Sequence, residues 1–416
     1  MHADLARWRS FRGRGYAATV ALLAAATLLV APQRAAAAPL VFGIYPGGAA
    51  GTVGPSGPLA PENPALRLAA LEQLRPANAP FVLHLYAGYT GAGSWTAAQQ
   101  VGSEIAQYTQ AGFEIELVLT YRPADGGSPA DVTGFDAFVS QTIDAFASNP
   151  RFVSLQVTNE ANVGGAPNAS DGFYAGAQDA LITGVIAAGQ EIARTGASQL
   201  QVGFNWAYAD DPGETAFWRY LGAHGGPAFV SALDWVGLDA YPDTWGPAAR
   251  GGLVASTTTT MKSALRALRT TYLPLAGIPS RVALHVSENG YPTGPGRTYA
   301  MQVQALRASI AAVEADSSRY GVTDYRWFDL RDADSASSSF ESQYGLMTDT
   351  YAPKPAFWAY RSLVAGGAVP VVTIATRTTA TRRARHRLRA RRSQARRRRR
   401  HVKLRPRAAR RTRGPA

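Results

Sequence analysis

The 416-residue sequence contains no cysteine. This absence excludes disulfide bonds and thiolate metal sites. The chain must therefore take its stability from a hydrophobic core, and its central part of roughly 340 residues is long enough to bury one. That length suits a single barrel of about 250 residues or more.

Long hydrophobic runs are missing after residue 38, where no segment approaches the about 20 apolar residues that a membrane-spanning helix needs. Within residues 1–38, arginines at 7, 9, 12 and 14 precede the apolar run 17–31, and alanines follow at 35–38. A basic leader, a short apolar region and small residues are typical of a signal peptide. Residues 1–38 are therefore predicted to be one, with cleavage after Ala37, and the mature protein is expected to be secreted or associated with the cell envelope.

Acidic residues are missing from residues 377–416, which hold 18 arginines and one lysine. The net charge of the whole chain is +13, yet residues 39–376 contain 18 basic and 28 acidic residues, a net charge of −10. Like-charge repulsion and low apolar content predict a disordered Arg-rich C-terminal tail, with residues 368–416 as linker and tail. The acidic domain and the basic tail need separate explanations.

Aromatic residues are also absent from this tail. Stacking on bases is thereby excluded, and together with the signal peptide this makes nucleic acid an unlikely partner. An exported polycation is expected to bind an anionic cell-envelope polymer by counterion release. A tail that only improves solvation is the alternative.

Eight strand-like runs, each followed by a helical or connecting segment, organise residues 39–367. The runs cover residues 41–45, 81–86, 114–121, 152–159, 201–206, 233–241, 282–287 and 323–329. Helical spacing of apolar residues is found over 64–74, 97–111, 135–146, 173–193, 257–268 and 301–315, and a last helix is expected to end near residue 364. Strand and helix alternating in this way predict the α/β class and a (β/α)8 TIM barrel.

The glycine-rich phosphate loop of dinucleotide-binding folds is absent after the first strand, which disfavours an open doubly wound sheet. No cofactor is expected. The acidic pair Asp210 and Asp211 and the other loop acids are too scattered to indicate a metal site, so no metal is expected either.

Two glutamates carry the main chemical signal. Glu160 follows the fourth strand-like run and Glu288 follows the seventh. Active sites of (β/α)8 barrels lie at the C-terminal ends of the strands. Two facing carboxylates at that end are what retaining glycoside cleavage requires. Glu160 fits the proton donor and Glu288 the nucleophile, with the Tyr241 hydroxyl as a hydrogen-bond donor to Glu288.

With these positions the chain resembles clan A, the large (β/α)8 clan of retaining glycoside hydrolases, over residues 41–365. In that clan an Asn-Glu pair ends strand four and a nucleophilic glutamate ends strand seven, matched here by Asn159-Glu160 and Glu288. The resemblance implies that Asn159 binds the sugar 2-hydroxyl and that Trp327 on strand eight forms a sugar platform. The segments 344–347 and 354–356 also resemble the approach to the clan's last helix. Many members carry an arginine on strand two, whereas this chain has His84 there.

The expected activity is that of a secreted retaining β-glycoside hydrolase acting on a poly- or oligosaccharide, as a monomer. His84, and Asn205 and Trp206 on strand five, are further candidates for substrate binding, while ordinary barrel packing is the alternative for Trp327. Asp239 and Asp329 also end strands and are interpreted as supporting or loop-capping groups. Two other functions stay open, namely an inactive sugar-binding barrel that serves as an envelope adhesin, and a transglycosylase. The sequence does not determine the sugar or the linkage.

Overall fold

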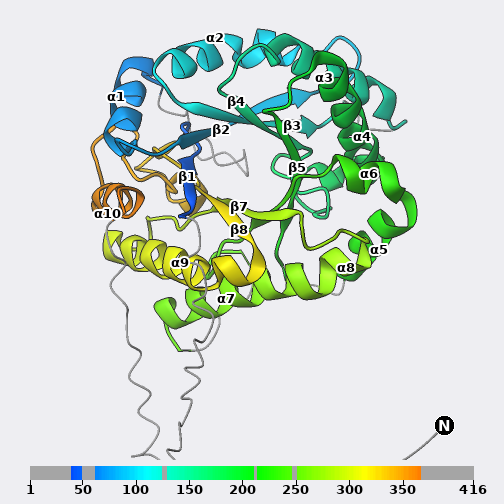
Figure 1. The fold of residues 1–416 in the computed structure, drawn as a ribbon. Coiled ribbons are helices and arrows are strands. Elements are labelled where there is room, and N and C mark those ends of the chain that lie inside the picture. The colour runs from blue at the N-terminus through cyan, green and yellow to red at the C-terminus, as the bar shows by residue number, and fades with distance from the viewer. Residues whose placement is uncertain (1–38, 49–60, 124–128, 210–212, 246–250, 367–416) are drawn as a thin grey trace, which may run out of the picture. The chain divides into compact units, whose positions relative to one another are not determined.

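The computed structural model describes residues 39–48, 61–123, 129–209, 213–245 and 251–366. Within them eight parallel strands close into a barrel in chain order (Figure 1). The strands are β1 (Val41–Ile44), β2 (Phe81–Tyr89), β3 (Glu114–Tyr121), β4 (Phe152–Val157), β5 (Gln201–Ala207), β6 (Trp235–Asp239), β7 (Ala283–Asn289) and β8 (Val322–Trp327). The predicted (β/α)8 fold is confirmed. The expected signal peptide and the basic tail lie outside the described residues.

Helices surround the barrel as an outer ring (Figure 1). They are α1 (Pro64–Leu74), α2 (Ala97–Gln110), α3 (Val132–Phe146), α4 (Ala177–Thr195), α5 (Glu214–His224), α6 (Gly226–Ala232), α7 (Leu253–Ala267), α8 (Leu273–Leu275), α9 (Tyr299–Tyr320) and α10 (Pro355–Val364). The sequence did not predict α5 and α6, because the Gly-Gly-Pro run at 225–227 interrupts this segment. None of the helices in the described part of the chain is long and apolar enough to cross a membrane.

Local signals begin and end the helices. Thr96 and Gln99 form a reciprocal capping box at the start of α2, and each satisfies a free backbone N–H group. Gly112 follows this helix with φ of 91°, a backbone conformation that glycine adopts without steric cost. These short-range rules explain why the predicted bounds of α1 and α2 are close to those observed.

The strand ends around the two glutamates differ from the prediction. The fourth strand was expected to continue to Asn159 but ends at Val157, because Thr158 and Glu160 have φ of 64° and 49°. A left-handed backbone cannot continue a strand. The sixth strand ends at Asp239, so Tyr241 lies in the following loop rather than on the strand.

Charged side chains fill part of the barrel interior. Glu116 of β3 is fully buried, receives a hydrogen bond from His84 at 2.8 Å and lies 3.3 Å from the Arg326 guanidinium. Burial alone would raise the pKa of Glu116, but Arg326, the nearby His285 and the hydrogen bond from His84 lower it well below its usual range. The interior therefore holds an ionised carboxylate beneath the C-terminal end of the barrel.

Candidate active site

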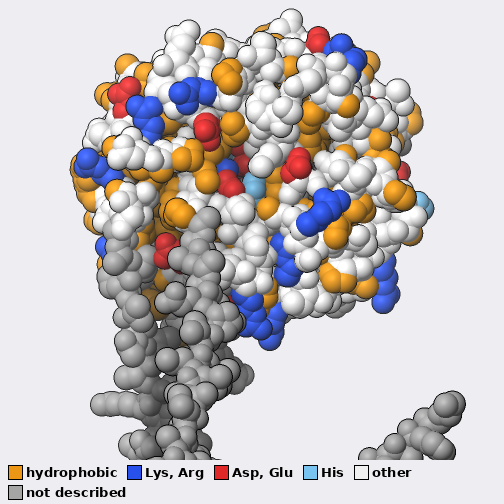
Figure 2. Space-filling view, viewed as in Figure 1, with side chains coloured by type: hydrophobic (Ala, Val, Ile, Leu, Met, Phe, Trp, Pro, Cys, Tyr) orange, Lys and Arg blue, Asp and Glu red, His pale blue; other side chains and the backbone are white. Residues whose placement is uncertain are grey.

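A cavity of about 950 Å³ opens at the C-terminal end of the barrel. Figure 2 shows a hollow at the centre of one face, with acidic side chains gathered in it. Every strand contributes to its wall, either from its C-terminal half or from the first three residues of the loop that follows. The strand-end lining residues are Tyr45, Tyr86, Thr120, Glu160, Ala207, Asp239, Glu288 and Phe328. Its volume is typical of a site for a small-molecule ligand or for part of a polymer.

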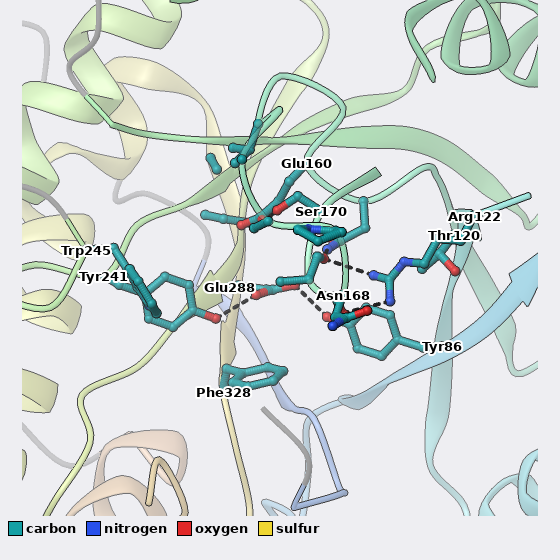
Figure 3. Close-up of a pocket in the computed structure, with 18 of the residues that line it drawn as sticks. Tyr86, Thr120, Arg122, Glu160, Asn168, Ser170, Tyr241, Trp245, Glu288 and Phe328 are labelled. Carbon is teal, nitrogen blue, oxygen red and sulfur yellow. Dashed lines mark hydrogen bonds between the residues drawn. The ribbon is translucent and has the colours of Figure 1, made fainter. Parts of the chain in front are cut away.

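Glu288 lies near the end of β7, where two phenol groups hold its carboxylate. Tyr86 donates to Oε1 and Tyr241 donates to Oε2, each at 2.5 Å (Figure 3). The hydrogen bond expected from Tyr241 is therefore present, whereas Tyr86 was not singled out from the sequence. These two bonds fix the orientation of both carboxylate oxygens, as a nucleophile requires.

Glu160 follows β4 and is held at its backbone and its side chain. Its backbone N–H donates to the Asn205 side chain at 2.7 Å, and its carboxyl accepts from the Ser170 hydroxyl at 2.5 Å. Burial in the cavity wall, together with the nearby Glu288 charge, raises the pKa of Glu160 to about 8. Glu160 therefore carries its proton at neutral pH, the state that a general acid needs.

Asp239 is a third acid in the same wall. Oxygens of Glu160, Asp239 and Glu288 all lie within 4.8 Å of one another. Asp239 accepts from Ser287 at 2.6 Å and from Asn205. Burial, and then the charges of Glu288 and Glu160, raise the pKa of Asp239 well above its usual value. The sequence assigned Asp239 only a supporting role, but the structure places it directly on the cavity.

Three close carboxylates are also ligands that a divalent cation accepts. Their oxygens are largely engaged already, because both oxygens of Glu288, both of Asp239 and Oε2 of Glu160 accept hydrogen bonds. Nothing else among the described residues forms a comparable group of histidines and acids. The absence of a metal stays a prediction.

Asn159 and Asn205 belong to one buried network. Asn205 donates to the Asn159 side-chain oxygen at 2.8 Å, and Asn159 donates to the Ala169 carbonyl at 2.9 Å. Asn159 lines the cavity, as the 2-hydroxyl role requires, while Asn205 supports Glu160 and Asp239 from behind. Binding of the sugar by Asn159 stays a prediction.

Two other candidates lie away from the cavity surface. Trp206 is fully buried and packs on Trp218 and Tyr272, because neighbouring side chains of a strand point to opposite faces. His84 is 1% exposed and lies below the cavity, 4.0 Å from Oε1 of Glu288. The structure therefore gives Trp206 no direct contact with a ligand in the cavity, and it gives His84 a place beneath the nucleophile.

Trp327 does not provide the expected platform. It is fully buried and packs on Tyr360 of α10, whereas the next residue, Phe328, lines the cavity and stacks on Tyr45 with ring centroids 5.0 Å apart. The side chain at 327 points toward the helices and the one at 328 into the cavity. Trp327 therefore serves in ordinary barrel packing, the alternative considered from the sequence.

Asp171 holds the loop that carries Ser170. Its fully buried carboxylate accepts from the backbone N–H groups of Tyr121 and Asn159, each at 2.7 Å, and pairs with Arg122 at 3.2 Å. The helix predicted over 173–193 begins only at Ala177, because this segment forms a loop that reaches the site. The sequence gave no local signal for this role of Asp171, since partners such as Tyr121 are distant in the chain.

Comparison with protein-family models and with curated proteins finds no match. Solved structures do match. A family 39 glycoside hydrolase from Bacteroides cellulosilyticus WH2 aligns with a TM-score of 0.54 and 14% identity over 79% of this chain, and the chain spans only 64% of that structure. A family 1 β-glucosidase from Thermotoga maritima has a TM-score of 0.53 and 12% identity over 72% of this chain and 86% of its own.

Fungal β-1,4-galactanases align with a TM-score of 0.53 and 11% identity, over 78% of this chain and 99% of theirs. All three matches are (β/α)8 barrels of clan A. At these identities the similarity concerns the fold. The chain therefore has the barrel architecture of clan A glycoside hydrolases, as its resemblance implied.

Proposed function

We propose that this protein is a retaining β-glycoside hydrolase that cleaves a poly- or oligosaccharide. The observation that carries the proposal is the pair Glu160 and Glu288, which line the same cavity and have one oxygen each within 4.8 Å of the other's. Retaining enzymes place their carboxyl groups about 5–5.5 Å apart, while inverting enzymes need about 6.5–9.5 Å to admit water. The short separation supports double displacement.

The two environments support opposite roles for the two glutamates. Glu160 is protonated at neutral pH and donates that proton to the leaving oxygen while the Glu288 carboxylate attacks the anomeric carbon. The glycosidic bond breaks and an ester to Glu288 forms. Glu160, now ionised, takes a proton from water, whose oxygen attacks the same carbon and releases Glu288 as a carboxylate. Asn159, which lines the cavity, binds the 2-hydroxyl of the sugar in this proposal.

The first test is the stereochemistry of the product. Hydrolysis of β-glycosides, screened with aryl glycosides and polysaccharides, is expected to give the β-anomer first, followed by mutarotation, in time-resolved proton NMR. Initial release of the α-anomer would contradict the retaining mechanism. Sugar binding without turnover across a broad panel would support the adhesin instead, and transfer to added acceptor sugars in preference to water would identify a transglycosylase.

We further propose that the protein is exported and that its basic tail retains it at the cell envelope. Deleting residues 377–416 removes 19 positive charges and none of the described residues. Activity on small soluble substrates and the melting temperature are expected to stay unchanged. Binding to isolated envelope is expected to weaken steeply with salt in the full-length protein, because each neutralised anion releases a counterion.

The matched control for this experiment keeps the tail length and replaces its arginines with glutamine. This variant and the deletion should both fail to sediment with envelope at low salt. Equal binding of all three forms, or binding that ignores salt, would rule out an electrostatic anchor.

A further inference from the structure

A continuous chain of hydrogen bonds connects the barrel interior to Glu288. Glu116 bonds to Nδ1 of His84 at 2.8 Å, Nε2 of His84 bonds to the Tyr86 hydroxyl at 2.9 Å, and Tyr86 donates to Glu288 at 2.5 Å. His84 and Tyr86 are two residues apart on β2, so both side chains point to the same side of the strand. All four groups are buried or lie at the floor of the cavity.

Counting protons along this chain assigns the state of His84. Glu116 is ionised and can only accept, so Nδ1 of His84 carries a hydrogen. The single hydroxyl hydrogen of Tyr86 is directed to Glu288, so the Tyr86 oxygen is the acceptor toward His84. Nε2 therefore carries a hydrogen as well. With both nitrogens protonated, His84 is an imidazolium.

The charges around His84 agree with a cation at this position. Glu116 lies on one side of the ring and Glu288, 4.0 Å from Nε2, on the other. On β8, Arg326 contacts Glu116, and on β7, His285 lies 3.7 Å from it. Just after β1, Tyr45 packs against Tyr86, and burial keeps the Tyr45 phenol protonated by raising its pKa. The groups that face His84 directly are therefore the carboxylates of Glu116 and Glu288 and the neutral phenol of Tyr86.

We propose that His84 is a positioning residue that acts, as an imidazolium and through Tyr86, to keep Glu288 a carboxylate. This inference rests on the proposed function. If the Nε2 proton moved to the Tyr86 oxygen while the Tyr86 proton moved to Glu288, His84 would become neutral and Glu288 a carboxylic acid. That acid could not attack the sugar. The imidazolium also favours the carboxylate that reappears when water releases the sugar from Glu288.

Nitrogen NMR of the histidine rings tests the charge without turnover. In protein labelled with 15N-histidine, with the His84 signal identified by its loss in His84→Gln, both ring nitrogens are expected to be protonated near neutral pH. Glu288→Gln removes the anion 4.0 Å from Nε2, so a smaller fraction of the His84 rings is expected to carry both protons in that variant at the same pH. Glu341→Gln alters a different acid of the cavity wall and should leave that fraction unchanged. A neutral His84 ring in the wild type would overturn the proposal.

A double-mutant cycle tests whether His84 acts through Tyr86. On aryl glycosides whose rate is limited by sugar release, His84→Gln and Tyr86→Phe are each expected to lower kcat by roughly 10- to 100-fold, because a charge-assisted contact is lost. The double variant should be no slower than Tyr86→Phe alone. Effects that multiply would show that the two residues act independently and would overturn the relay.

His285→Gln is the matched control, since His285 is equally buried and faces Glu116 from another strand. It should leave kcat nearly unchanged, and melting temperatures should confirm that each variant folds. If His84→Gln does not fold, the NMR signal of His84 can be identified in Tyr86→Phe by its shift and the charge is still measured. If no glycoside is cleaved, the proposed function fails while the NMR experiment still decides the state of His84.

Discussion

Replacing Glu288 with alanine is expected to lower turnover by at least about 10³-fold, the loss typical when a covalent nucleophile is removed. Two phenol hydrogen bonds orient the Glu288 carboxylate. No other described carboxylate of the cavity is held in this way, so none is oriented to replace it as nucleophile. Initial rates on an aryl β-glycoside, with the enzyme concentration raised to compensate, measure the loss. The Glu288→Ala variant also leaves a space beneath the anomeric carbon.

Azide should use that space. It is expected to restore part of the activity and to give an α-glycosyl azide, of inverted configuration, because it attacks from the side that Glu288 occupied. Glu72→Ala, an exposed acid on α1, is the control and should behave as the wild type with and without azide. Near-normal turnover of Glu288→Ala would show that the nucleophile is another residue.

Replacing Glu160 with alanine is expected to produce a loss that depends on the leaving group. A proton donor matters most when the leaving oxygen is basic, so natural sugars should be cleaved at a small fraction of the wild-type rate. Glycosides of acidic phenols should still form the ester with Glu288, which a burst of released phenol would reveal. Azide should then give a β-glycosyl azide of retained configuration, opposite to the product of Glu288→Ala. Equal losses on both classes of substrate would contradict the acid/base role.

The pH profile provides a second signature of Glu160. Its pKa is raised to about 8, and the protonated form is the active acid, so kcat/KM of the wild type should fall as the pH rises through about 8. In Glu160→Ala this fall is expected to disappear on substrates with acidic phenols, since no proton is donated. An unchanged alkaline fall in the variant would assign it to another group.

The structure explains why some site residues were predictable. Glu160 and Glu288 follow apolar runs of recognisable length, and in a (β/α)8 barrel the C-terminal ends of all strands meet at one face. Chain order alone therefore placed both carboxylates on the same face. Tyr241, two residues beyond the end of β6, was predictable for the same reason.

Other residues depend on which way a side chain points. Trp327 and Phe328 are neighbours, but one packs under α10 and the other lines the cavity. A shift of one residue along a strand reverses the face to which the side chain points. The sequence does not define the register with that accuracy, so Trp327 was expected at the cavity position that Phe328 occupies.

The sequence by itself determined the alternation of strands and helices, the closed barrel and the two glutamates, because these follow from local periodicity and chain order. The tertiary structure decided the contacts between strands distant in the chain. Tyr86 meets Glu288 across 202 residues, and Asp239 comes close to both glutamates. Burial and the closeness of the three acids raise the pKa of Glu160 and of Asp239, since a pKa depends on burial and on neighbours in space. The strand ends locate the acids, and the packing of the barrel gives Glu160 and Glu288 different surroundings, which support the proposed proton donor and the proposed nucleophile.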